Sequence, residues 1–196
     1  MTTALGLRER KKAATREALH EAAVRLAAEH GVDNVTVEAI ADAATISRRT
    51  FSKYFASKEQ ALLHADQTRV AHLIDLVGAR PPAESPWTAL TRATEEWLAE
   101  PAASDRRTID RYRELRRHPA LLAEQVATYA AAERELTSAI AQRIPAGPTA
   151  TLRARLLAAN FLSTLRVAHQ LWLEPPAHAL PRLVREALTL TAESFS

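Results

Sequence analysis

Cysteine is absent from this chain of 196 residues, and glycine occurs only four times. Without cysteine there is no disulfide and no thiolate ligand for zinc, so nothing points to an oxidising compartment or a cysteine-based metal site. The N-terminus lacks the apolar core of a signal peptide, and no apolar run approaches the length of a membrane span. We therefore expect a soluble, cytoplasmic protein that does not contact a membrane.

The residues that are abundant favour α-helix. Aromatic residues make up 5% of the chain and hydrophobic residues 47%, with alanine and leucine prominent. Alanine, leucine, arginine and glutamate are good helix formers, whereas the aromatic residues that favour strands are few. No strand-like alternation is present, and the apolar content is sufficient for a folded core. The sequence predicts an all-α fold.

Charge is distributed unevenly along the chain. Residues 1–58 contain ten Lys or Arg and seven Asp or Glu, which gives 10 − 7 = +3, while the remaining residues balance at sixteen of each sign. All the lysines lie in the first segment, as Lys11, Lys12, Lys53 and Lys58. A basic segment attached to a neutral body is suited to binding nucleic-acid phosphates.

Capping residues and prolines divide the chain into about nine expected helices. Thr36, Ser47 and Ser57 are suitable N-caps, and Ser57 forms a capping box with Gln60. Gly31 is a suitable C-cap. The expected helices cover residues 7–30, 37–44, 48–55, 57–79, 86–100, 104–117, 119–144, 148–174 and 178–195.

Two short helices joined by a tight turn follow the long first helix. This is the arrangement that places a recognition helix in the major groove of DNA. Ile40, Phe51 and Phe55 are expected to form the core, which leaves a polar and basic face outside. That face is either a solvated helix surface or a DNA contact, and the clustered basic residues favour DNA. The expected DNA-binding residues are Thr36, Ser47, Arg48, Arg49, Thr50, Ser52, Lys53, Tyr54 and Lys58.

The stretch from Thr36 to Leu63 resembles the signature of the TetR family, and the agreement extends over residues 8–63. The family's conserved positions match Ser47, Thr50-Phe51, Tyr54-Phe55 and Ser57-Lys58-Glu59. The resemblance implies a helix-turn-helix DNA-binding domain at 1–58 and a larger helical domain for effector binding and dimerisation at 59–196. Most members of the family are repressors that a small molecule releases from DNA.

Three residues depart from the family pattern. Thr45 replaces the usual glycine of the turn, where a left-handed backbone would be strained. Arg49 and Ser52 replace a frequent glycine and a frequent tyrosine on the DNA face. We hypothesise that Arg49 gives a stronger preference for guanine, because arginine bonds the O6 and N7 atoms of that base.

The segment from Leu156 to Leu173 is apolar almost all round, which indicates a helix buried on more than one side. In the resembled family the last two helices form the dimer interface. We therefore predict a homodimer through residues 150–195. A two-fold dimer would bind a palindromic operator whose half-sites lie about 34–36 Å apart.

Ligand binding is less clearly encoded. Arg116 falls on the apolar face of its expected helix, so it either binds an anionic effector, lies at a rim, or forms a salt bridge with a residue such as Glu133 or Glu124. The run 106–117 is either a solvated face or a surface for an anion such as an acyl-coenzyme A or a carboxylate. The candidate ligand-binding residues are Trp87, Trp97, Tyr112, Arg116, Tyr129, Asn160, Thr164 and His169. The effector is unknown.

An enzyme is the main competing class. The sequence contains no glycine-rich phosphate loop, no HExxH motif and no nucleophile elbow, and its seven histidines are scattered. We therefore expect no catalytic centre, no metal and no cofactor. The expected function is a repressor released by a small molecule. A ligand-independent regulator and an activator remain alternatives, because the sign of regulation depends on the position of the operator.

Overall fold

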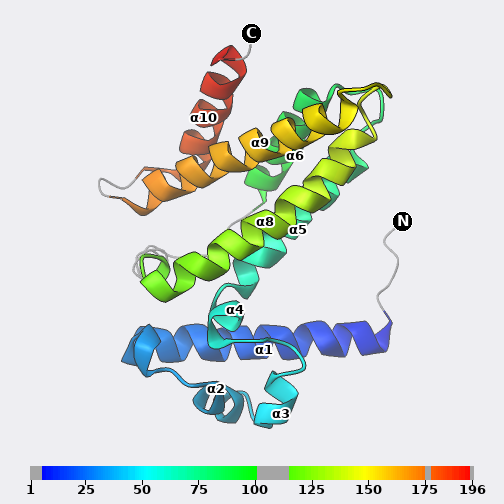
Figure 1. Ribbon diagram of the computed structural model, residues 1–196. Helices are drawn as coiled ribbons and strands as arrows, with labels where there is room; N and C mark the ends of the chain where they lie inside the picture. The colour runs from blue at the N-terminus through cyan, green and yellow to red at the C-terminus, as the bar shows by residue number, and fades with distance from the viewer. Residues whose placement is uncertain (1–5, 101–114, 175–177, 195–196) are drawn as a thin grey trace. The chain divides into compact units, whose positions relative to one another are not determined.

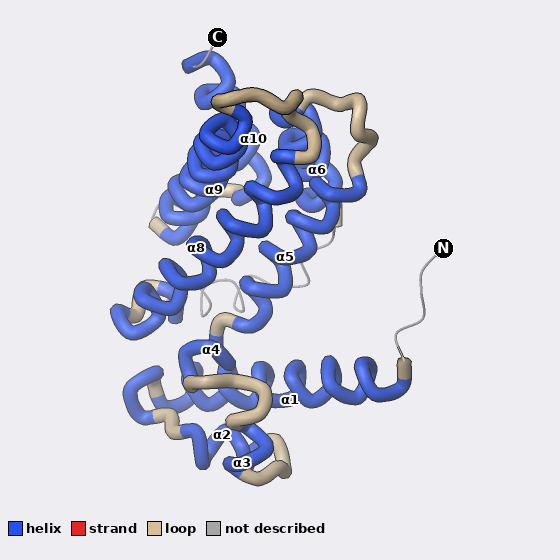
Figure 2. The backbone as a smooth tube through the Cα atoms, turned by 45° about the vertical axis from the view of Figure 1, so that its right-hand side comes forward, coloured by secondary structure: helices blue, strands red, loops and turns tan. Residues whose placement is uncertain are grey.

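The computed structural model describes residues 6–100, 115–174 and 178–194. Every regular element in these ranges is helical, so the predicted all-α fold is confirmed (Figures 1 and 2). The elements are α1 (Leu7–His30), the 3-10 turn η1 (Val32–Asn34), α2 (Val37–Ala43), α3 (Arg48–Phe51), α4 (Lys58–Leu62), α5 (His64–Ala79), α6 (Pro86–Ala99), α8 (Pro119–Ala141), α9 (Ala150–Leu173) and α10 (Leu180–Ser194).

Two expected helices differ most from the structure, while the ends of the other described helices lie within about three residues of the expected ones. The helix expected at 48–55 ends at Phe51, and the one expected at 57–79 is divided at Leu63 into α4 and α5. Ala61, Leu62 and Leu63 are all buried. Three consecutive residues point 100° apart on a straight helix, so they cannot share one narrow buried face unless the chain bends there. The helix expected at 104–117 lies outside the described residues except at its end.

The predicted N-caps are present. The side-chain oxygens of Thr36, Ser47 and Ser57 each accept a hydrogen bond, at 3.1 Å, from the backbone N–H three residues further on. The capping box differs by one residue, because the Gln60 side chain accepts from the N–H of Ala56, at 2.9 Å, and not from that of Ser57. Each cap satisfies a backbone donor that the first helical turn leaves unpaired.

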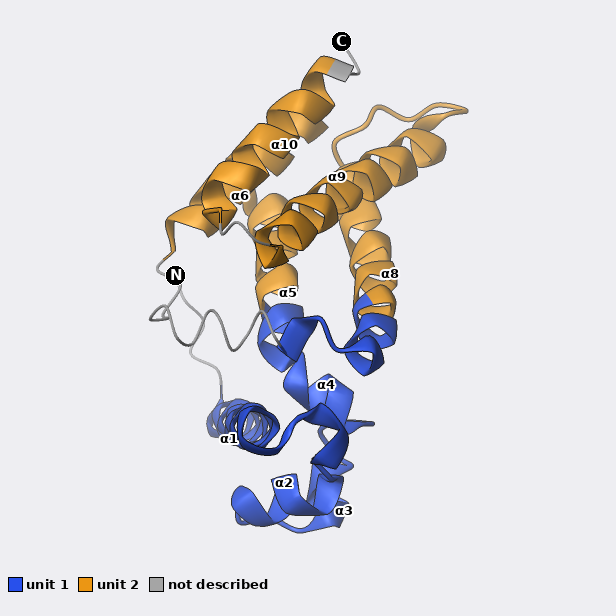
Figure 3. Ribbon diagram, turned by 90° about the vertical axis from the view of Figure 1, so that its left-hand side faces the viewer, with its two compact units in different colours: residues 1–68, 105–125 blue, residues 69–104, 126–196 orange. Residues whose placement is uncertain are grey.

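The chain divides into two compact units (Figure 3). The first contains residues 1–68 and 105–125, so α4 and the start of α8 pack with the helix-turn-helix. Its core includes the fully buried residues Leu19, Ile40, Leu63 and Leu121. The boundary at residue 58 between a DNA-binding domain and an effector-binding and dimerisation domain remains a prediction.

The second unit contains residues 69–104 and 126–196. Its core joins α5, α6, α8, α9 and α10, and α10 packs along α9 (Figure 1). The Arg143 guanidinium donates to the carbonyls of Val77, Arg80 and Pro81 at 2.6–2.8 Å. Since the last carbonyls of a helix have no partner within it, Arg143 closes the C-terminal end of α5.

Candidate nucleic-acid interface

The turn between α2 and α3 sets the position of residues 48–55, which we call the recognition segment. Thr45 in this turn has a φ of 59°, the left-handed conformation expected for a position usually filled by glycine. The Ile46 N–H donates to the Ala41 carbonyl at 2.9 Å, which closes the turn. Beneath it, Ile40 and Phe51 are buried. The turn therefore has a defined geometry, although a threonine at this position costs about 1–2 kcal/mol in backbone strain.

The opposite face of the recognition segment is exposed and basic. Arg48, Arg49, Ser52 and Lys53 all lie at the surface, whereas Phe51 points into the core. The guanidinium of Arg48 pairs with the carboxylate of Glu38 on α2 at 2.9 Å. In the part of the chain that is described, Arg49 and Lys53 have no carboxylate partner within 4.0 Å. These two cations are therefore available to an external anion.

Four hydroxyl groups among the expected DNA-binding residues are already engaged locally, including that of Thr36, which accepts from the Ala39 N–H. Ser47 and Thr50 share a hydrogen bond at 2.9 Å between their hydroxyls, and the Ser52 hydroxyl donates to the Arg48 carbonyl at 3.3 Å. Ser47, Ser52 and Thr36 are nevertheless exposed to solvent. Thr36 and Ser47 are the N-caps of α2 and α3, and Ser52 follows the last residue of α3.

Lys58 has a different environment. Its ammonium donates to the carbonyls of Val32 at 2.8 Å and Val35 at 2.9 Å, with Asp33 at 3.4 Å. An ammonium has three donors, so these carbonyls use its hydrogen-bonding capacity. Lys58 thereby connects the start of α4 to the turn that precedes α2.

Two histidines lie where α1 meets α4 and α5. His20 Nδ1 donates to the Ala61 carbonyl at 2.8 Å, and the ring of His64 contacts those of His20 and Phe55. Partial burial lowers the pKa of His64, and the nearby His20 lowers it further. A carboxylate, Glu17, acts in the opposite direction. The neutral form of His64 is therefore favoured in the folded protein.

The expected ligand-binding arginine is engaged inside the first unit. Arg116 is buried and forms an ion pair with Asp66 at the start of α5. The sequence suggested a salt bridge with Glu133 or Glu124, so the type of interaction was among the alternatives but the partner was not. A buried guanidinium requires such a counter-charge, because desolvation of an unpaired charge is costly. The other residue expected on this face, Tyr112, lies outside the described residues.

The remaining ligand candidates belong to the second unit. Trp87, Trp97 and Tyr129 pack, partly buried, against its core. The indole N–H of Trp97 donates to the Arg69 carbonyl at 3.0 Å, with the Arg69 guanidinium 4.4 Å from the ring centroid. The Thr164 hydroxyl lies 2.8 Å from the Asn160 carbonyl and 2.9 Å from the Thr191 hydroxyl, and the His169 ring packs against Trp172. These contacts give each side chain a role within the folded unit.

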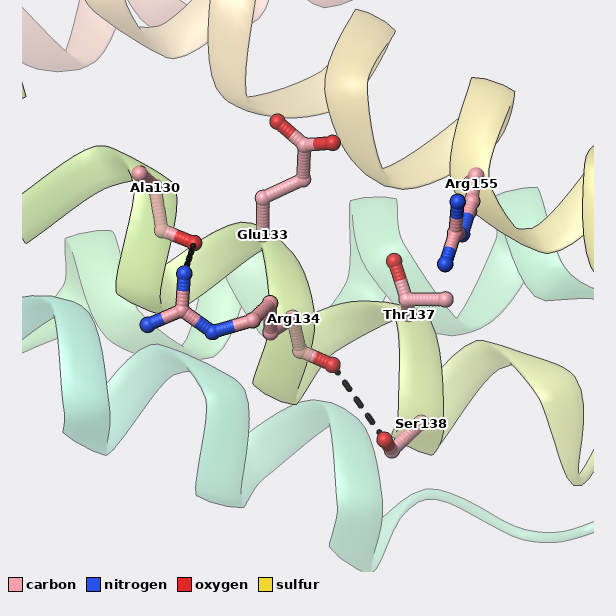
Figure 4. A pocket seen from close by; sticks show the side chains of 6 residues that line it. All are labelled: Ala130, Glu133, Arg134, Thr137, Ser138 and Arg155. Atoms are coloured by element: carbon pink, nitrogen blue, oxygen red, sulfur yellow. Dashed lines mark hydrogen bonds between the residues drawn. The ribbon is translucent and has the colours of Figure 1, made fainter.

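An open groove of about 500 Å³ lies between α8 and α9 (Figure 4). Its lining is Ala130, Glu133, Arg134, Thr137, Ser138 and Arg155, none of which is among the expected ligand-binding residues. Arg134 donates to the Ala130 carbonyl at 3.0 Å. Within the described residues, no three His, Asp or Glu side chains lie close enough together to hold a metal ion.

One face of α9 is apolar and exposed. Leu152, Leu156, Val167 and Leu171 lie along it with between 44% and 58% of their surface accessible, and Leu190 of α10 is 57% exposed. The opposite face is buried through residues such as Phe161. Leucine side chains exposed in a row along a helix are typical of a surface that another protein covers. None of the described helices is both long and apolar enough to cross a membrane.

A buried core that holds a short, basic recognition segment against a longer helix defines a helix-turn-helix protein. The sequence profile described as "Bacterial regulatory proteins, tetR family" matches residues 19–65, and that of the "MftR C-terminal domain" matches residues 84–196. The HTH-type transcriptional regulator TcmR of Streptomyces glaucescens is 31% identical over 173 residues, which cover 85% of this chain and 76% of the relative. The chain belongs to the TetR family of transcriptional regulators, as its resemblance implied.

Solved structures share the fold. Thermus thermophilus FadR, a transcriptional repressor solved in complex with lauroyl-CoA, has a TM-score of 0.53 and 24% identity, with 92% of this chain and 95% of that chain covered. SmeT, the repressor of the Stenotrophomonas maltophilia multidrug efflux pump SmeDEF, has a TM-score of 0.55 and 22% identity, with coverage of 91% and 89%. At these identities the comparison establishes the fold alone.

Proposed function

We propose that this TetR-family regulator is a homodimer that binds a palindromic operator and represses transcription. The observation that carries the proposal is the exposed cationic face of the recognition segment. Arg49 of α3 and Lys53 just after it have no carboxylate partner among the described residues, and Phe51 is buried behind them. Such a face is suited to base edges and phosphates in the major groove.

The expected DNA-binding residues divide by chemistry. Arg48, Arg49, Ser52 and Lys53 are proposed to contact base edges, and Arg48 would exchange its ion pair with Glu38 for this contact. The residues proposed to hold phosphates at the flanks are Thr36, Ser47, Thr50 and Tyr54. Lys58 is proposed to act on DNA binding indirectly, because its ammonium holds the backbone at Val32 and Val35.

Dimerisation is proposed through residues 150–195. The support is the exposed apolar row on α9 together with Leu190 on α10. In a two-fold interface both subunits contribute the same patch, so the apolar row of one subunit would pack against the apolar row of the other. Such a dimer would present two recognition segments to half-sites about 34–36 Å apart.

Release by a small molecule is the final part of this proposal. Its support is the fold shared with FadR, which was solved with lauroyl-CoA. A specific observation favours the ligand-independent alternative: Arg116 pairs with Asp66, and the open groove of the second unit contains none of the expected ligand residues. Addition of lauroyl-CoA, as the first probe, to a preformed complex with DNA should weaken binding if a ligand of that class is the effector.

The DNA-binding proposal is tested by selecting bound sequences from random DNA with the full chain. A palindrome should be enriched, and Arg49→Ala should lose discrimination at one base pair of each half-site by about 1–3 kcal/mol. Arg25→Ala, an exposed arginine elsewhere on α1, is the matched control. If Arg49→Ala ranks all operator variants as the unmodified protein does, Arg49 does not read a base. Enrichment of no sequence would overturn the proposed function.

A further inference from the structure

A second basic surface lies beside the recognition segment. A groove of about 660 Å³ is formed by the first turns of α1 together with Lys53 and Tyr54, which come after the end of α3. Its lining consists of Leu7, Arg8, Glu9, Lys11, Lys12, Thr15, Lys53 and Tyr54. We call it the basic groove. It contains four cationic side chains and one carboxylate, and none of its α1 residues was expected from sequence to bind DNA.

The position of these residues on α1 is the first argument. Thr15, Lys12 and Arg8 precede the buried Leu19 by four, seven and eleven residues, which is the spacing of a single helix face. The face that packs on the core around Leu19 therefore continues towards the N-terminus as a basic face. Figure 2 shows these turns of α1 extending beyond the rest of the first unit. In this basic part of the face Arg8 and Lys12 are exposed, so no apolar side chain covers them.

The lack of counter-charge is the second argument. Glu9, the only carboxylate among the described residues that line the groove, lies 4.0 Å from the ammonium of Lys12, and both side chains are about half exposed. Among the residues that the structure describes, Arg8, Lys11 and Lys53 have no carboxylate within that distance. Exposed ion pairs of the Glu9–Lys12 kind contribute little. The groove therefore keeps an excess of positive charge, which favours an anionic occupant.

The connection with α3 identifies that occupant. Lys53 and Tyr54 belong both to the basic groove and to the expected DNA-binding residues. We propose that the basic groove holds the DNA phosphate backbone next to the half-site that α3 contacts, with Lys11 and Lys12 each binding a phosphate. This inference rests on the proposed operator binding. An ammonium that binds a phosphate acts as a point charge on a group that every nucleotide carries, so Lys11 and Lys12 contribute to affinity and not to sequence choice.

The test uses the full chain with the double substitution Lys11→Gln and Lys12→Gln. Binding to a selected operator and to random DNA is measured between 50 and 200 mM salt. If each lysine holds one phosphate in each of two subunits, the slope of log affinity against log salt becomes shallower by about 3–4. The ratio of the unmodified chain's affinity to that of the variant then decreases on the order of 100-fold between 50 and 200 mM salt. Arg25→Gln, an exposed cation further along α1, should leave the slope unchanged.

The outcomes separate this inference from the proposed function. Equal weakening on both DNAs together with the shallower slope supports the basic groove as a phosphate site. If the unmodified chain binds its operator with a steep salt dependence and the double variant has the same affinity and slope, the inference is wrong while the proposed function stands. A change in sequence preference in the variant also overturns it, because base contacts are then involved. An unmodified chain that selects no DNA overturns both.

Discussion

Thr45 and His64 show how far a single residue can be interpreted from sequence. The left-handed backbone at Thr45 was expected from the resemblance to the TetR family, in which this position of the turn is usually glycine, and its φ is 59°. The environment of His64 was not expected. Its contacts with His20 and Phe55 join segments that are distant in the chain, and only the packing of α1 against α4 and α5 brings these rings together.

The lowered pKa of His64 predicts a pH dependence of stability. The neutral side chain is favoured in the fold, while the unfolded chain binds a proton near pH 6.5. The free energy of unfolding should therefore be highest above pH 6.5 and should fall as the pH decreases below it. His64→Phe, which keeps a ring against Phe55, should reduce this fall, as measured by urea unfolding at pH 7.5 and 5.5.

The exposed His30 provides the control for this prediction. His30→Gln should retain the pH dependence of the unmodified chain, because its ring is 58% exposed. The ring of His64 faces two cationic or potentially cationic groups, His20 and Arg16, and one carboxylate, Glu17. If the stability of His64→Phe depends on pH as that of the unmodified chain does, then protonation of His64 does not destabilise the folded protein at low pH.

At the scale of elements, the helix signals in the sequence were reliable where they are local. The bounds of α1 and the caps of α2, α3 and α4 agree with the predictions because they depend on neighbouring residues alone. The division between α4 and α5 was missed, since it depends on burying Leu63 against residues from other helices. A capping residue marks the start of a helix, but no local signal marks a bend that tertiary packing requires.

Two lysines of the helix-turn-helix should behave in opposite ways. Lys58→Gln removes an ammonium that donates to backbone carbonyls of η1 and its neighbour, and should lower the free energy of unfolding by about 1–3 kcal/mol. Lys53→Gln removes an exposed ammonium and should change stability by less than about 0.5 kcal/mol. Lys53→Gln should instead weaken DNA binding and flatten its salt dependence.

Chemical denaturation and salt titration of DNA binding, carried out on both lysine variants, test this contrast. Each variant is the control of the other, because both replace one lysine by the same neutral residue. If Lys58→Gln is as stable as the unmodified chain and loses only salt dependence, then its ammonium leaves the carbonyls to bind phosphate, and the indirect role proposed here is wrong.

At the scale of the whole molecule, the exposed apolar row on α9 predicts self-association. Val167→Glu places a carboxylate in the middle of the row on both subunits, where it would be buried beside apolar side chains. Burial of an unpaired charge costs several kcal/mol, so the dimer should dissociate at micromolar concentrations, as sedimentation velocity would show. Loss of high-affinity operator binding should accompany dissociation.

Leu122→Glu is the matched control for dimerisation. Leu122 lies on α8, is 49% exposed and is outside the apolar row, so the same added charge should leave the dimer intact. A Val167→Glu protein that stays dimeric, or an unmodified chain that is monomeric at micromolar concentration, would place the interface elsewhere or remove it from the proposal.

The sequence by itself determined the helical fold, the helix caps and the basic face of α3, because periodicity, capping and charge are properties of nearby residues, and the family resemblance implied the strained turn at Thr45. The family followed from the same short segment. Only the tertiary structure decided that Lys58 binds backbone carbonyls, that Arg116 pairs with Asp66 and that α1 adds Lys11 and Lys12 to the surface beside Lys53. These relations join residues that are distant in the chain. Local patterns show which side chains seek a partner, whereas the packing of the helices decides which partner each one meets.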